Sequence, residues 1–272
     1  MTDVLIIGAG HNGLVCAAYL ARAGMDVLVL ESSASAGGMS ASRTVSDDYR
    51  FPGLAHVTYP VSKTIRKDLR LDRYGYSTGT PIDTVALDAD GRHLVIGADA
   101  VNGAELPEPD AAAFPAFKHQ YLEFARKIQP LFDNKPPRLK NMGFADARTL
   151  ARLGWNIRMG LGKEAMYEFL RVAAINIYDV LDEKFQDDRL KGAIAADAVM
   201  GSAMGPRTPG TVLTWLQRLQ GELHGPLSCQ GGAQLVDALT QSAEDAGATI
   251  RFDAHVEKIL TDKGKAFGVE LA

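Results

Sequence analysis

Three glycines near the start of the chain, Gly8, Gly10 and Gly13, have the spacing G-x-G-x-x-G. In a diphosphate-binding turn the first glycine permits the bend, the second lets the backbone approach the phosphates, and the third lets a helix pack closely on a strand. The N–H groups and positive dipole end of a helix that begins here attract phosphate oxygens. We therefore predict that the turn, including His11 and Asn12 between the glycines, binds a diphosphate.

A carboxylate follows at the distance that a dinucleotide site requires. Glu31 ends the apolar segment 27–30 and is followed by Ser32. An acid at the end of the second strand can accept hydrogen bonds from the hydroxyls of an adenosine ribose. The order of strand, glycines, helix, strand and acid is far more specific than the glycines alone.

The elements that must position these residues are also visible in the sequence. The apolar run 4–7 is typical of a parallel strand that is buried on both faces. In the helix that follows, one face is predicted to contact the sheet and Cys16 is predicted to be a buried, reduced thiol. The residues of the sheet-facing side are Leu14, Ala17, Ala18 and Ala21.

A glycine pair, Gly37-Gly38, comes shortly after the acid. With the string GAGHNGLVCAAYLARAG it resembles the extended FAD motif of the amine oxidase and phytoene desaturase superfamily, most closely its phytoene-dehydrogenase-like branch. The resemblance implies that this pair lies against the diphosphate and ribityl parts of FAD. Many relatives carry arginine next, where this chain has Met39, so a guanidinium contact to the cofactor is not expected there.

The resemblance returns near the end of the chain, in Pro226, the segment 231–235 and Val256. It implies that the backbone of Val256 lies at the adenine ring. It also implies an α/β fold with a Rossmann-type FAD-binding domain and a parallel sheet. That domain is discontinuous, from residues 1–75 and 225–272, and a mainly helical substrate or cap domain occupies 76–224.

Periodicity predicts the elements of the inserted domain. Strands are expected at 84–87 and 93–96, and helices at 146–160, 164–176, 188–203 and 211–220. An apolar stripe at helical spacing suggests either an ordinary core helix or the wall of a pocket for an apolar substrate. The stripe consists of Phe114, Phe117, Tyr121, Phe124, Ile128 and Leu131.

Composition limits the choice of partners. The net charge of −4 argues against general nucleic-acid binding. The two cysteines form no C-x-x-C pair, and no apolar stretch is long enough to span a membrane, so a cytoplasmic location is expected.

The segment 135–163 is locally basic, with Asp146 as its one acid. It suggests either peripheral contact with an anionic membrane or a solvated helix that is paired with acids elsewhere.

The resemblance implies an FAD-dependent oxidoreductase, a dehydrogenase, desaturase or oxidase that transfers hydride from an apolar small-molecule substrate to flavin N5. No metal is required. His56 follows the cofactor motif where relatives approach the flavin ring and is a candidate for stabilising charge there, although such a histidine is more often a hydrogen-bonded structural residue. Two alternatives remain. One is a non-catalytic module that binds FAD, a ligand or a partner. The other is an NAD-dependent dehydrogenase, which would need neither Gly37-Gly38 nor Val256.

The last two predicted strands, 255–260 and 266–271, stand at the end of the chain. Family members continue well beyond this point and add a segment that closes over the flavin. We therefore expect a truncated or split enzyme that depends on a complementary C-terminal chain, or that self-associates through exposed apolar surface.

Overall fold

The computed structural model describes residues 2–46, 49–138, 140–229 and 231–272. The chain divides into two compact units. The first comprises the residues up to Pro81 together with Leu227–Ala272, and the second is Ile82–Pro226. Both unit boundaries lie a few residues after the positions that the sequence suggests.

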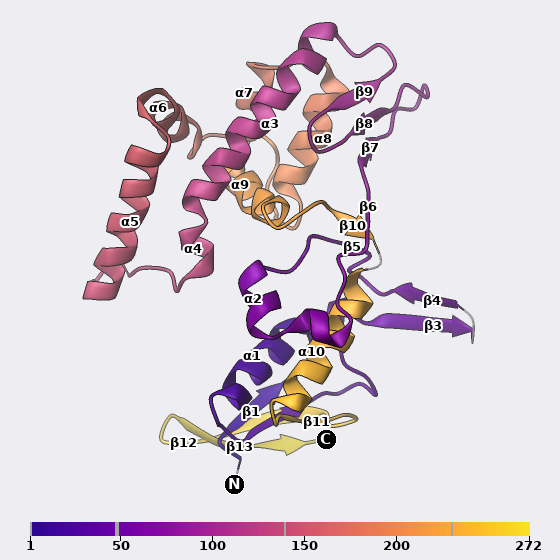
Figure 1. The fold of residues 1–272 in the computed structure, drawn as a ribbon, viewed down its shortest axis with the longest axis vertical. Helices are drawn as coiled ribbons and strands as arrows, with labels where there is room; N and C mark the ends of the chain where they lie inside the picture. The colour runs from indigo at the N-terminus through magenta and orange to yellow at the C-terminus, as the bar shows by residue number, and fades with distance from the viewer. Residues whose placement is uncertain (1, 47–48, 139, 230) are drawn as a thin grey trace. The chain divides into compact units, whose positions relative to one another are not determined.

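A parallel sheet forms the centre of the first unit. It contains β1 (Val4–Ile7), β2 (Val27–Leu30) and β11 (Thr249–Arg251) in the order β1-β2-β11. Helices α1 (His11–Arg22) and α10 (Gly231–Asp245) pack against each other beside this sheet (Figure 1). The four residues predicted for the sheet-facing side of α1 are all buried, as expected.

Two predictions for this region are wrong. The strand β1 is not buried on both faces, because its alternate residues Leu5 and Ile7 are exposed while Val4 and Ile6 pack on the core with α1. Cys16 is exposed rather than buried. Two residues along a helix rotate a side chain by about 200°, so Cys16 lies opposite the buried position of Leu14.

Short elements complete the first unit. The strands β3 (Ser42–Ser46) and β4 (Tyr49–Pro52) form a hairpin, and β10 (Ser228–Cys229) pairs with both β5 (Val57–Thr58) and β6 (Thr80–Pro81). The helix α2 (Lys63–Asp68) and two 3-10 turns, Gly38–Ser40 and Leu71–Tyr74, lie between them. The predicted terminal strands are present as a hairpin of β12 (Val256–Asp262) and β13 (Lys265–Leu271).

The second unit is mainly helical. Its strands β7 (Thr84–Ala86), β8 (Leu94–Ile96) and β9 (Val101–Gly103) form an antiparallel sheet. The helices are α3 (Glu108–Ile128), α4 (Pro130–Asp133), α5 (Phe144–Gly160), α6 (Lys163–Val172), α7 (Ile177–Asp182), α8 (Asp188–Val199) and α9 (Thr211–Glu222). The helix predicted for 164–176 ends early, because Asn176 caps α7 through a hydrogen bond from the N–H of Asp179.

The aromatic stripe of α3 lies in the core of the second unit. Phe117, Tyr121 and Phe124 are buried there, and the ring of Phe117 stacks on Trp215 of α9 at 5.6 Å between centroids. Asp110, in the first turn of α3, is also buried, and its carboxylate accepts hydrogen bonds of 2.7 to 3.0 Å from the N–H groups of Gln186 and Asp187. This carboxylate connects α3 to the loop before α8.

Within the described residues, no helix has both the length and the apolar character that crossing a membrane requires.

Candidate functional site

The glycine turn joins the end of β1 to the start of α1. Gly8 adopts a φ of 97° and donates its N–H to the carbonyl of Leu30 at the end of β2, at 2.7 Å. Gly10 is the N-cap of α1 and has no side chain to bond the N–H groups of the first helical turn. That turn contains His11, Asn12 and Gly13 and no acid, so the positive end of the helix is available to an anion.

Gly10 and Gly13 serve different physical purposes. A Cβ at Gly13 would overlap the carbonyl oxygen of Gly8, so the glycine there is required by the fold. A Cβ at Gly10 would meet no atom within 4 Å, and its φ of −71° suits any residue. The fold therefore does not require glycine at position 10, and the open space above it fits the close approach of a phosphate group.

The glycine pair lies directly on this turn. Gly37 forms a parallel bridge with Gly10 and donates its N–H to the carbonyl of Ala9 at 2.9 Å. A Cβ at Gly38 would be 3.3 Å from the Cα of Gly10. Both glycines have positive φ, of 130° and 55°. The sequence elements that suggest phosphate binding and those that suggest FAD are thus one contiguous surface.

Glu31 is buried beside the turn. One of its carboxylate oxygens accepts the N–H of Ala9 at 2.7 Å, and the other accepts the N–H of Ser33 at 2.9 Å and the hydroxyl of Ser32 at 3.3 Å. Burial raises the pKa of Glu31, but the hydrogen bonds from Ser33, Ala9 and Ser32 together outweigh it, so the pKa lies below its usual value. The group is therefore a carboxylate at neutral pH, which accepts hydrogen bonds and donates none.

Residues from the other end of the chain lie against Glu31. The N–H of Glu31 bonds the carbonyl of Arg251, and the carbonyl of Glu31 accepts the N–H of Ala254 at 2.8 Å. Val256 begins β12 two residues later and is half-buried. The structure therefore brings the segment 251–254, just before Val256, to the acid.

The segment after the glycine pair makes further backbone contacts. Met39 is exposed, and its carbonyl accepts the N–H groups of Leu54 and Ala55. His56, the candidate catalytic residue, is exposed in this same loop, and its Nδ1 lies 3.0 Å from the carbonyl of Leu54. Gly232, in the segment 231–235, approaches the same loop closely, because a Cβ there would be 3.1 Å from the carbonyl of Ala55; the sequence pattern did not predict this contact. The glycine itself was the available signal.

A pocket of about 600 Å³ lies within the second unit, between α3 and the junction of α5 with α6. Phe117 and Phe124 of the aromatic stripe form part of its wall, and His119 and Lys184 are its basic groups. The stripe therefore contributes both to the core and to a largely apolar pocket.

Comparisons with known proteins support a nucleotide-binding site at the glycine turn. Residues 6–70 match the family model of an NAD(P)-binding Rossmann-like domain. The chain is 31% identical to the mouse "Pyridine nucleotide-disulfide oxidoreductase domain-containing protein 2", over 99% of this chain and 50% of that protein. It is 26% identical to the all-trans-zeta-carotene desaturase of Myxococcus xanthus, over 98% of this chain and 49% of the desaturase.

Among solved structures, putrescine oxidase bound to putrescine has a TM-score of 0.58 at 17% identity, over 99% of this chain and 54% of that chain. This likeness concerns the fold. The chain spans about half the length of the curated relatives that it matches. The predicted resemblance to phytoene desaturases agrees with the carotene desaturase among the relatives, and the predicted Rossmann-type nucleotide-binding domain is confirmed.

Proposed function

We propose that this chain, a relative of carotenoid desaturases over about half their length, is the FAD-binding portion of an oxidoreductase that acts on an apolar small molecule. The observation that carries the proposal is the contact between the two glycine elements. Gly37 and Gly38 lie on Gly10, beside a deprotonated Glu31. A plain NAD site needs the turn and the acid but not the second glycine element.

Each residue then has a distinct role in binding. The first turn of α1, from Gly10 to Gly13, contacts the diphosphate through backbone N–H groups. Glu31, with Ser32 beside it, accepts hydrogen bonds from the adenosine ribose. Gly37 and Gly38 let the loop before Met39 lie close to the diphosphate and ribityl chain, and Val256 lies at the adenine.

When bound, FAD supplies a ring that accepts hydride from a C–H or C–N bond of the substrate. The protein must then bind and orient the substrate and exclude water from the ring. His56 lies in the loop that is bonded to the carbonyl of Met39, directly after the glycine pair, and its Nδ1 lies 3.0 Å from the carbonyl of Leu54. We assign it a positioning role near the flavin, so that His56→Ala should leave FAD content unchanged while it lowers turnover.

An apolar substrate fits the second unit. The pocket beside α3 combines phenylalanine walls with a few polar groups, which is the usual composition of a small-molecule site. The name of the Myxococcus xanthus relative specifies a carotene, which is also an apolar molecule. Two free cysteines among the described residues, Cys16 and Cys229, fit a reducing cytoplasmic location.

The proposal includes a requirement for further polypeptide. The relatives are about twice as long as this chain. The second face of the parallel sheet presents exposed Leu5 and Ile7, and within the described residues β1 pairs only with β2. An apolar face at an open sheet edge suits a further segment that would also shield the flavin from water.

The cofactor proposal is tested by saturating the purified chain with FAD and NAD together, removing free nucleotide and denaturing the protein. Release of FAD in stoichiometric amount supports the proposal, and retention of NAD or of no nucleotide contradicts it. The requirement for further polypeptide is tested separately by co-expression with the segment that supplies the second half. Turnover should appear only in the complex, and Leu5→Ser with Ile7→Ser should weaken assembly without loss of bound FAD.

A further inference from the structure

The outer face of α5 is an unusual surface. Six residues that recur three or four apart lie on one side of this helix and are exposed. Phe144 is 86% exposed, Trp155 67% and Met159 59%. The set, called here the outer face, is Phe144, Arg148, Arg152, Trp155, Arg158 and Met159.

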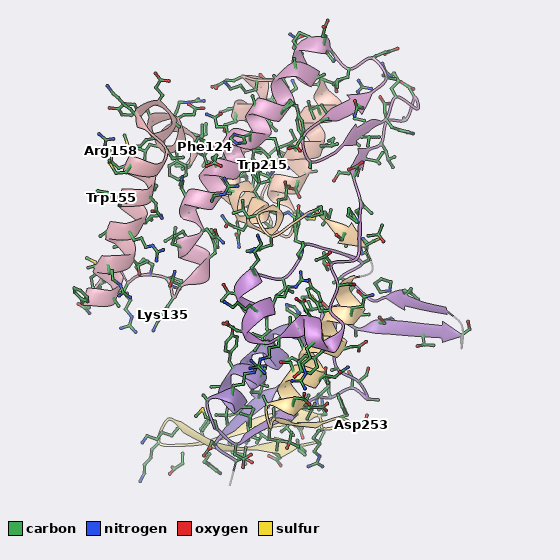
Figure 2. All side chains as sticks on the ribbon, viewed as in Figure 1. Phe124, Lys135, Trp155, Arg158, Trp215 and Asp253 are labelled. Atoms are coloured by element: carbon green, nitrogen blue, oxygen red, sulfur yellow. The ribbon has the colours of Figure 1, made fainter. Side chains whose placement is uncertain are left out.

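The opposite side of α5 explains why this face is turned outward. Leu153 and Ile157 are half-buried against the core that α3 builds. Figure 2 shows Trp155 and Arg158 on the side of α5 that faces away from α3. The orientation of the helix is therefore fixed by packing, and three large apolar side chains remain exposed beside three arginines.

The charges of the outer face are uncompensated. The side chains of Arg148, Arg152 and Arg158 form no ion pair or hydrogen bond with any residue that the structure describes. The one acid of α5, Asp146, instead accepts the N–H groups of Gly143 and Arg138. These bonds attach the preceding loop, with exposed Lys135 and Lys140, to the start of the helix. A chain with net charge −4 thus concentrates positive charge on one helix.

We propose that the outer face of α5 docks on the surface of an anionic lipid membrane. Arginines interleaved with tryptophan, phenylalanine and methionine match a headgroup layer, where cations contact lipid phosphates and apolar side chains enter the acyl boundary. Charge complementarity selects the lipid surface, because an uncharged apolar partner would leave three arginines unpaired. Docking requires neither cofactor nor substrate, so it can be tested independently of the proposed activity.

The two tryptophans make the test direct. Trp215 is 2% exposed, so a change in fluorescence on adding vesicles reports Trp155. The purified chain is mixed with vesicles of equal parts phosphatidylcholine and phosphatidylserine, or of phosphatidylcholine alone. We expect sedimentation with the anionic vesicles, an emission shift to shorter wavelength that Trp155→Phe abolishes, and weaker binding at high salt.

Charge reversal of the outer face supplies the decisive variant. Each basic residue near an anionic surface is worth about a fivefold change in partitioning, so Arg148→Glu with Arg152→Glu and Arg158→Glu should lower binding by at least about 100-fold. Replacing the same three arginines with lysine should retain most of it. The matched control, Lys63→Glu with Lys258→Glu and Lys265→Glu, changes the net charge equally at exposed positions of the first unit and should bind as the unmodified chain does.

Thermal unfolding monitored by circular dichroism shows that each variant is folded. Equal binding of the unmodified chain to both kinds of vesicle would overturn the proposal, as would an equal loss in the control. If the outer-face variant binds vesicles as well as the unmodified chain, the face serves another occupant, such as a further protein segment, and the lipid proposal is wrong.

Discussion

The carboxylate of Glu31 accepts the backbone N–H of Ala9 at 2.7 Å, so the acid at the end of β2 is bonded to the turn that follows β1. The N–H of Gly8 also donates a hydrogen bond to the carbonyl of Leu30, at the end of the same strand. The residue proposed to bind ribose is therefore also a structural tie across the glycine turn. Its removal should affect ligand affinity and fold stability together, and the two effects can be separated by measurement.

Replacing Glu31 with alanine is expected to weaken FAD binding by about 1–3 kcal/mol, the scale of lost charge-assisted hydrogen bonds. Fluorescence titration of the purified chain with FAD measures this change. Glu244→Ala removes an exposed carboxylate from α10 and serves as the control. Equal affinities for the Glu31 and Glu244 variants would remove Glu31 from the site.

The pH dependence of stability should also reveal Glu31. Its pKa in the folded chain is below that in the unfolded chain, so it stabilises the fold above the unfolded value of about 4.3. That contribution is lost as the pH falls through the folded pKa. Urea unfolding should therefore show the gap between the unmodified chain and Glu31→Gln shrinking from neutral pH to acid. A constant gap would contradict this assignment.

The second and third glycines of the motif, Gly10 and Gly13, should respond oppositely to alanine. Gly13→Ala places a methyl group against the carbonyl of Gly8 and should lower the unfolding temperature. Gly10→Ala meets open space, so the chain should stay as stable as before while FAD binding weakens. Thermal unfolding without FAD, paired with FAD titration, distinguishes the two. Strong destabilisation by Gly10→Ala would mean that its glycine serves the fold.

Asp110 is expected to be the most sensitive acid of the second unit. Its truncation to alanine leaves the N–H groups of Gln186 and Asp187 without their acceptor and should cost about 1–3 kcal/mol or more of unfolding free energy. Glu108→Ala, two residues earlier on the same helix and exposed, should change stability little. Denaturant unfolding of both variants provides the comparison.

The sequence patterns predicted those features that depend on residues close together along the chain. The spacing of Leu14 and Ala17 identified the buried side of α1, and the glycines with Glu31 identified the turn. The exposure of Leu5 and Ile7 could not be predicted in this way, since an apolar run does not reveal which layers cover a strand. The contact of Asp110 with residues far along the chain likewise depends on tertiary packing. The roles of the individual site residues stay predictions.

The pairing of β2 with β11 has a kinetic consequence. Leu30 and Arg251 are neighbours in the sheet, although most of the chain separates them in sequence. During synthesis the β1–α1–β2 segment can form early, and the second unit has its own hydrophobic core in which to fold. The backbone around Glu31 gains its last partners only when the two ends of the chain meet, after a long loop has closed. Nucleotide added to a refolding chain should therefore act late, on a species in which both cores are already built.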